Sequence, residues 1–142
     1  MEAHNMEAKM KHLEMIQGVI SRMASNSFAL KGWAVTLVAG IFALANKDAN
    51  EEYFLVAYIP IIVFWGLDAY YLLQERLFRT LYNYVRKLPN VEIDFSMDTS
   101  PQTFHEGKNR YGWCFFSKTI LWFYLPLAIV SAGIIILTHM QA

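Results

Sequence analysis

The chain has 142 residues, of which 56% are hydrophobic, 15% aromatic and only 17% charged, and its formal net charge is +0. A soluble protein of this length needs more charge to cover its surface, so the composition favours one membrane domain over residues 1–142 and argues against a soluble one. Cys114 is the only cysteine, which excludes a disulfide bond within the chain.

Residues 1–26 carry apolar and charged side chains on opposite faces of a predicted helix. The apolar stripe consists of Met6, Met10, Leu13, Ile16, Ile20 and Met23. This spacing predicts an amphipathic cytoplasmic helix that lies on the membrane, pairs with other copies of itself or packs on the same chain. No proline interrupts residues 6–46, so one helix of about 41 residues is possible. Ser25–Ser27 mark the place where it is expected to bend or break, because their side chains compete for backbone hydrogen bonds.

Three apolar stretches are predicted as transmembrane helices, at residues 28–46, 53–73 and 119–138. Each is close to the roughly 20 residues that cross a bilayer. Pro60 lies inside the second stretch and frees the carbonyl of Val56, so a kink is expected there. The fold class predicted is therefore an all-α membrane protein with three spans.

Residues 74–118 form a segment between the second and third spans. Residues 74–88 continue the helical pattern of the second span, which is expected to extend into the cytoplasm and stop at Pro89. Residues 90–112 are predicted as a loop, in which Thr99, Ser100 or Pro101 can start a short helix.

The distribution of Lys and Arg predicts the topology. Among the twelve, only Lys47 falls between the first two spans, and none follows Lys118. Positive charge marks the cytoplasmic side, so we expect a multi-pass protein of the bacterial inner membrane with its N-terminus inside and its C-terminus outside.

No catalytic signature is present in the sequence. Phosphate-binding loops, dinucleotide glycine patterns and metalloprotease motifs are absent, and the four histidines are scattered without metal-ligand spacing. We therefore expect a protein that is not an enzyme and that needs no metal or cofactor.

Two charges fall inside the predicted spans, Lys31 and Asp68. Charge within a bilayer is unfavourable unless it is paired or faces a polar cavity. The first and second spans run antiparallel and place both residues at similar depth, which predicts an ion pair. The pair either fixes the register of the two helices or forms part of a gate at a pore mouth.

Gly32, Thr36 and Gly40 are spaced four residues apart and share one face of the first span. Small residues let membrane helices approach closely, so the face predicts helix packing or, alternatively, the wall of a pore. A pore needs several chains around an axis, because three spans rarely enclose a pathway alone. We take a homo-oligomer of four chains as the working assumption.

Basic side chains are concentrated in residues 74–118. Positive-inside topology and contact with anionic lipid headgroups account for them. A site for an anionic ligand such as a nucleotide or oligonucleotide is the alternative, since arginine donates two hydrogen bonds to phosphate and nearby aromatic rings can stack on bases. The candidate ligand-binding residues are Arg76, Arg79, Arg86, Lys87, Lys108 and Arg110.

The run RMASNSFALKGWAVTL at residues 22–37, together with the overall order of segments, resembles small bacterial membrane effectors of anti-phage defence. Hailong-type channel effectors and the two-span effectors associated with SMODS and SLOG proteins are the families it is similar to. The resemblance implies a homo-oligomeric cation channel that depolarises an infected cell under the control of a nucleotide made by a partner nucleotidyltransferase. The third predicted span departs from the two-span pattern.

The leading functional hypothesis is therefore an ion-channel effector gated from the cytoplasmic side. Lys31, Gly32, Thr36, Gly40 and Asp68 are its candidate pore and gate residues. The alternative is a non-conducting scaffold or regulatory subunit that docks a soluble partner through residues 1–26 and 74–112.

Overall fold

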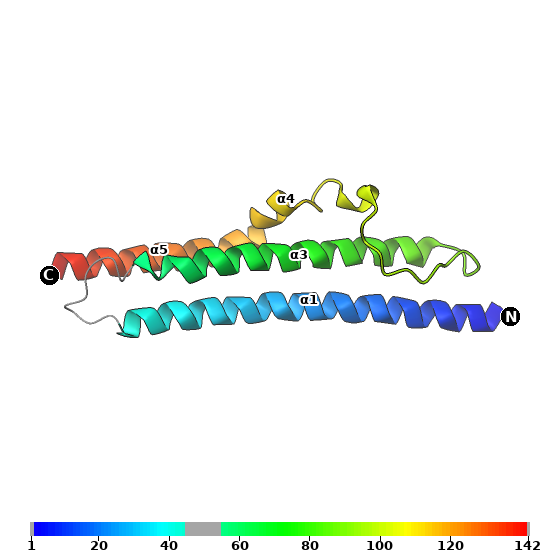
Figure 1. The fold of residues 1–142 in the computed structure, drawn as a ribbon, viewed down its shortest axis with the longest axis horizontal. Helices are drawn as coiled ribbons and strands as arrows, with labels where there is room; N and C mark the ends of the chain where they lie inside the picture. Colours follow the sequence, from blue (N-terminus) through cyan, green and yellow to red (C-terminus); the bar gives the residue numbers. More distant parts are fainter. Residues whose placement is uncertain (1, 45–54, 142) are drawn as a thin grey trace.

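The computed structural model describes residues 2–44 and 55–141, and this part of the chain is helical and contains no strand (Figure 1). The elements are α1 (Glu2–Leu44), α3 (Tyr58–Lys87), the 3-10 helix η1 (Gln102–His105), α4 (Tyr111–Phe115) and α5 (Lys118–Gln141). The predicted all-helical fold is confirmed.

Helix α1 is continuous over its 43 residues, so the single long helix that the sequence allowed is confirmed and the break at Ser25–Ser27 is wrong. The Ser27 hydroxyl does not compete for backbone bonds; it donates to Asp68 Oδ1 on α3 at 2.5 Å. A tertiary contact has therefore removed the reason for a break. At 1.5 Å per residue, the helix is roughly 64 Å long.

Helix α3 begins at Tyr58, which places Pro60 in its first turn. The N–H groups of a first turn have no intrahelical partner, so proline is accommodated there. Residue 55 is helical and residues 56 and 57 form a turn, so the helix is interrupted one turn before Pro60, where the sequence predicted a kink. The carbonyl of Val56 accepts a bond from the N–H of Ile59 at 3.1 Å. At its other end α3 continues to Lys87 with Leu88 as its C-cap, as predicted from Pro89.

Helices α1 and α3 form a long antiparallel hairpin, and α5 lies beside the first half of α3 (Figure 1). The N-terminus and the C-terminus lie at opposite ends of the molecule. The short helix η1 begins after Pro101, where the sequence predicted a helix start. Helix α4, which was not predicted, leads into α5.

Two clusters of buried apolar side chains hold the hairpin together. In the half that contains the N-terminus, Leu13, Ile16 and Ile20 pack against α3, which shows that the central part of the amphipathic stripe packs within the chain. Met6 and Met10 of the same stripe are exposed. The partners of this first cluster are Leu77, Leu81, Val85, Ile93 and Phe104. The second cluster joins α1, α3 and α5 through Ala34, Val38, Ile61, Ala69, Ile120 and Tyr124.

Polar contacts close the end of the hairpin near the N-terminus. Lys9 Nζ donates to the carbonyls of Leu88 at 2.6 Å and Arg86 at 3.2 Å, so it caps the last turn of α3. One turn further along α1, His12 is only 2% exposed and packs edge-on against Phe95. Its Nε2 has no hydrogen-bond partner within residues 2–44 and 55–141.

Two helices of the described chain are long and apolar enough to cross a membrane, α1 over His4–Leu44 and α5 over Lys118–Leu137. Of the predicted second span, residues 53 and 54 lie outside the described residues, as do residues 45 and 46 of the first. Helix α3 is not among the two, because its apolar part from Tyr58 to Leu73 spans only roughly 24 Å and includes Asp68. Three transmembrane helices therefore stay a prediction, for which two of the described helices have the length and composition.

Candidate functional site

A small polar cluster joins α1 to α3 in the apolar half of the molecule. Lys31 Nζ donates to Asp68 Oδ2 at 2.5 Å and to the Ser27 hydroxyl at 2.9 Å, and this hydroxyl donates to Asp68 Oδ1. Asp68 is 0% exposed, and the side chain of Lys31 is 17% exposed. The predicted Lys31–Asp68 ion pair is confirmed, and Ser27 completes it as a triad.

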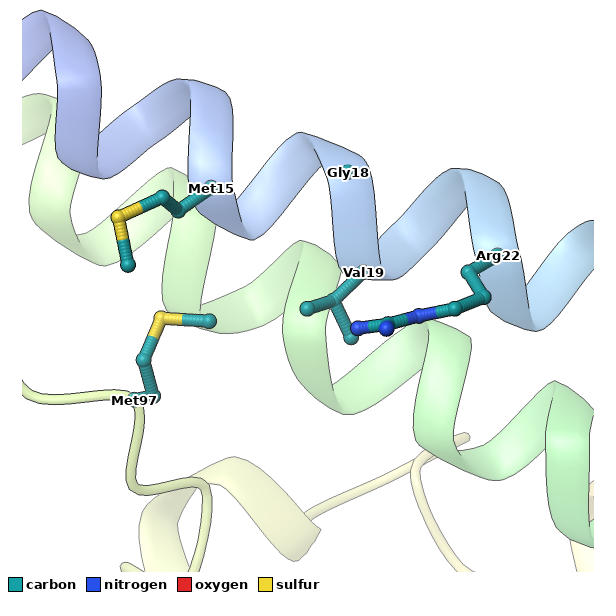
Figure 2. A pocket seen from close by; sticks show the side chains of 5 residues that line it. All are labelled: Met15, Gly18, Val19, Arg22 and Met97. Atoms are coloured by element: carbon teal, nitrogen blue, oxygen red, sulfur yellow. The ribbon is translucent and has the colours of Figure 1, made fainter.

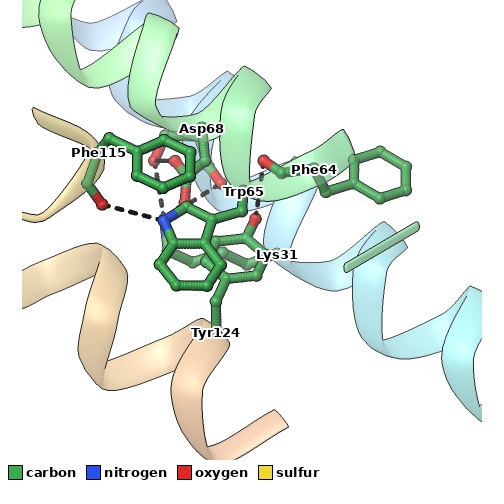
Figure 3. Close-up of polar contacts among 7 residues, drawn as sticks. Lys31, Phe64, Trp65, Asp68, Phe115 and Tyr124 are labelled. Atoms are coloured by element: carbon green, nitrogen blue, oxygen red, sulfur yellow. Dashed lines mark hydrogen bonds and ion pairs between the residues drawn. The ribbon is translucent and has the colours of Figure 1, made fainter. Parts of the chain in front are cut away.

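Aromatic rings surround this triad on the side of α5 (Figure 3). Trp65 stacks between Phe115 and Tyr124, with ring centroids 4.9 Å and 5.9 Å away, and its indole N–H donates to the Phe115 carbonyl at 2.9 Å. The Tyr124 hydroxyl donates to the Phe64 carbonyl at 3.2 Å. The Phe123 ring lies 6.0 Å from Lys31 Nζ. The rings separate the triad from the surroundings of the helices.

The geometry of the triad favours a structural role for the ion pair. Both carboxylate oxygens of Asp68 accept a hydrogen bond, and Lys31 is held by two side-chain oxygens and more weakly by the Ser27 carbonyl at 3.5 Å. A buried charge with its hydrogen bonds satisfied is stable in its position and fixes the register of the two helices. Ser27 stands one turn before Lys31. This i, i+4 spacing is the sequence signal that indicates its role.

The small-residue face of α1 points away from the rest of the chain. A Cβ added at Gly32 or Gly40 would meet nothing within 4 Å, and Thr36 is exposed. The Thr36 hydroxyl donates to the Gly32 carbonyl at 2.9 Å, within its own helix. The face is therefore smooth and open over about two turns, while Ala34 and Val38 face α3.

The six basic residues proposed to bind a ligand do not gather at one place. Arg76 and Arg86 are ten residues apart on α3, which separates their Cα atoms by roughly 15 Å. Arg76 donates to the Lys108 carbonyl at 2.7 Å and to Cys114 Sγ at 3.5 Å, and Arg79 is paired with Glu75 at 2.8 Å. Arg79 is exposed although it is paired, and the other exposed members are Arg86 and Lys87 at the end of α3, and Lys108 and Arg110 next to α4.

An open groove of about 500 Å³ lies between α1 and the loop that follows α3 (Figure 2). Met15 and Met97 approach each other across it from the two segments, and Arg22 lies along its other end. The lining is completed by Gly18 and Val19. No residue of the groove belongs to the predicted site.

The described residues contain no group of three or more His, Cys, Asp or Glu side chains able to hold a metal ion. Comparison with protein-family models, with curated proteins and with solved structures finds no match to this chain. Its function is therefore argued from the geometry above.

Proposed function

We propose that the protein is a homo-oligomeric ion channel of the bacterial inner membrane, controlled from the cytoplasmic side. The observation that carries this proposal is the open face of Gly32, Thr36 and Gly40 on an apolar helix. Small residues on a membrane helix provide close contact between helices, or a smooth wall beside water.

The distribution of exposed apolar side chains supports placement in a membrane. Large hydrophobic residues are exposed on all three long helices around the second cluster, where a soluble protein would bury them. They include Trp33, Leu37, Leu44, Ile59, Ile62, Val63, Trp122, Ile129, Val130 and Ile136. The other half of the hairpin carries most of the charges, and by the positive-inside rule it belongs in the cytoplasm.

Assembly through α1 follows from the exposure of its small-residue face. Three long helices are too few to enclose a pathway, so conduction requires several copies around an axis, each presenting one α1. The Lys31–Asp68 ion pair joins α1 to α3 and so fixes the orientation in which α1 presents its small-residue face. In this arrangement the triad positions the pore helix and does not itself line the pathway.

Control from the cytoplasm is assigned to the exposed basic residues Arg86 and Lys87 at the end of α3. Two adjacent cations at a helix C-terminus can bind phosphate groups of a nucleotide-type ligand. Helix α3 connects them to the triad without interruption. A nucleotide made by a partner enzyme in anti-phage defence is the ligand we propose.

Planar-bilayer recording of the purified protein tests conduction, and Gly32→Leu with Gly40→Leu tests the face. We expect the double variant to give no oligomers on chemical cross-linking and to reduce the current at least tenfold, because leucine side chains block the close approach of neighbouring α1 helices. Gly133→Leu on α5 is the matched control, since an added Cβ there also meets nothing within 4 Å. Wild-type protein that gives no current, with or without nucleotides, would exclude the channel; unchanged oligomers in the double variant would exclude the interface.

A non-conducting scaffold that docks a soluble partner is the second candidate. The groove favours it, because its lining comes from both segments assigned to docking, residues 15–22 and Met97. A photo-crosslinking amino acid placed at Val19 is expected to give one defined cross-link to the partner in cells. Met97→Asp should abolish this cross-link, because Met97 lines the same groove. The absence of any such product, combined with measurable current, would decide for the channel.

A further inference from the structure

Helix α4 and the residues around it form a surface of exposed aromatic and basic side chains. We propose that this surface binds the headgroups of anionic phospholipids at the cytoplasmic face of the membrane. We call it the α4 collar and define it by Lys108, Arg110, Trp113, Phe116 and Lys118. The inference rests on the membrane placement proposed above, but not on ion conduction.

The collar is held rigidly against α3. The Tyr111 hydroxyl donates to the Gly66 carbonyl at 2.9 Å, and the Trp65 indole donates to the Phe115 carbonyl at the same distance. On the inner side of α4, Cys114 is fully buried and accepts a bond from Arg76. Because these contacts fix the inner side, the opposite side of α4 is presented outward in one orientation (Figure 1).

The side chains presented outward suit the interface between hydrocarbon and water. Trp113 is 63% exposed and Phe116 67% exposed, and Trp122 near the start of α5 is 80% exposed. Tryptophan rings concentrate at this level of a bilayer because they combine an apolar body with a polar N–H group. An exposed tryptophan and phenylalanine on a rigid turn would leave a large apolar surface in water if lipid did not cover them.

Charge selects an anionic lipid over a zwitterionic one. Lys108, Arg110 and Lys118 are exposed, and the sequence contains no Asp or Glu after Glu106. The collar ends where α5 begins, and the first N–H groups of a helix carry the positive end of its dipole. The three cations and the helix N-terminus therefore suit the phosphate of a lipid headgroup, and the two aromatic side chains suit the neighbouring acyl chains.

The position of the collar along the hairpin agrees with this assignment. Gly66 and Trp65, which hold α4, lie within one turn of Asp68 on α3. On one side of this level the exposed residues of α3 are apolar, including Ile59, Ile62 and Val63; on the other side stand Glu75 and Arg79. The collar thus lies at the boundary between the apolar and the charged half.

Quenching of tryptophan fluorescence by brominated lipids tests the proposal in vesicles of phosphatidylcholine that hold the full-length protein. Brominated phosphatidylglycerol and brominated phosphatidylcholine are compared at the same mole fraction, and the Trp113→Phe variant gives the share of Trp113. For wild-type protein we expect Trp113 to be quenched two- to fivefold more by the anionic lipid, since each basic residue near the surface attracts it.

The double variant Arg110→Gln/Lys118→Gln is expected to bring this ratio to about 1, because both replaced cations belong to the collar. Arg86→Gln/Lys87→Gln is the matched control, which removes two charges at the far end of α3 and should leave the ratio unchanged. Equal quenching by the two lipids in wild-type protein, or an equal loss in the control, would overturn the proposal. So would abolition of the preference by micromolar ATP, which would assign the surface to a soluble phosphate ligand.

Alkaline carbonate extraction separates failure of this inference from failure of the membrane placement. Protein that stays in the vesicles but shows a ratio of 1 lacks the lipid preference alone. Protein that carbonate releases is not embedded, and both proposals fall together.

Discussion

Lys31 and Asp68 show how a charged pair is accommodated in apolar surroundings. Each charge depends on the other, because Asp68 is fully buried and its two oxygens are shared between Lys31 and Ser27. Removal of one partner leaves a buried charge without compensation, whereas removal of both leaves none. A single substitution is therefore expected to destabilise the protein far more than the double substitution does.

Asp68→Ala or Lys31→Met alone is expected to lower the free energy of unfolding by about 3–5 kcal/mol. Lys31→Met combined with Asp68→Leu should recover most of that loss. Thermal unfolding in detergent micelles measures both. The matched control, Lys11→Met with its exposed partner Glu7→Gln, should change stability by less than about 1 kcal/mol. Asp68→Ala that assembles normally but changes conductance would contradict the structural role and favour a gate.

His12 contrasts with the satisfied ion pair, because its buried Nε2 has no hydrogen-bond partner among the described residues. Leaving such an atom without a partner costs about 1–3 kcal/mol. His12→Leu is therefore expected to raise the unfolding temperature by several degrees, whereas His4→Leu at an exposed position should not. A lower unfolding temperature for His12→Leu would show that the imidazole contributes through its contact with Phe95.

At the scale of helices, the ends of α3 are fixed by different means. Its start needs no special partner because Pro60 occupies the first turn, while its end is capped by a side chain from α1. Lys9 thus joins residues separated by almost 80 positions in the sequence. The last turn of α3 depends on α1 for its stability.

Lys9→Met is expected to remove two charge-assisted hydrogen bonds and to accelerate amide hydrogen exchange at Arg86–Leu88 by roughly tenfold, which corresponds to about 1.4 kcal/mol. Lys11→Met, which loses only an exposed pair with Glu7, provides the comparison. Equal exchange rates in the two variants would mean that the cap does not stabilise this turn.

Long-range packing explains which elements the sequence could predict. The end of α3 at Lys87 could be predicted because Pro89 acts locally. The ion pair could be predicted because two apolar stretches joined by a short turn must run antiparallel. Helix α4 was missed because its five residues are held by hydrogen bonds to Gly66 and from Trp65, distant in sequence. The exposure of Gly32 and Gly40 could not be predicted either, because it depends on which face of α1 packs against α3.

The whole molecule divides into an apolar half and a charged half, and each terminus lies at the end of one half (Figure 1). This division is the basis for the proposed orientation. In the proposed orientation the loop around η1 lies in the cytoplasm and the end of α5 lies outside.

Labelling by a membrane-impermeant maleimide tests this orientation. The variants Glu106→Cys and Met140→Cys are labelled in spheroplasts, whose inner membrane is intact. We expect labelling at position 140 and none at position 106 until the membrane is opened. The native Cys114 is expected to react slowly, because it is fully buried and burial raises the pKa of its thiol. Unsubstituted protein measures its background. The reverse pattern of labelling would invert the topology.

The uninterrupted course of α1 has a mechanical consequence. A rod held at Lys31 has an inner arm of about 44 Å and an outer arm of about 20 Å, measured along the helix axis. If the hairpin pivots at the triad, a sideways displacement of 4 Å at the N-terminal end of α1 moves the end at Leu44 by roughly 2 Å in the opposite direction. The hairpin would then act as a lever that halves the travel and increases the force it delivers across the membrane.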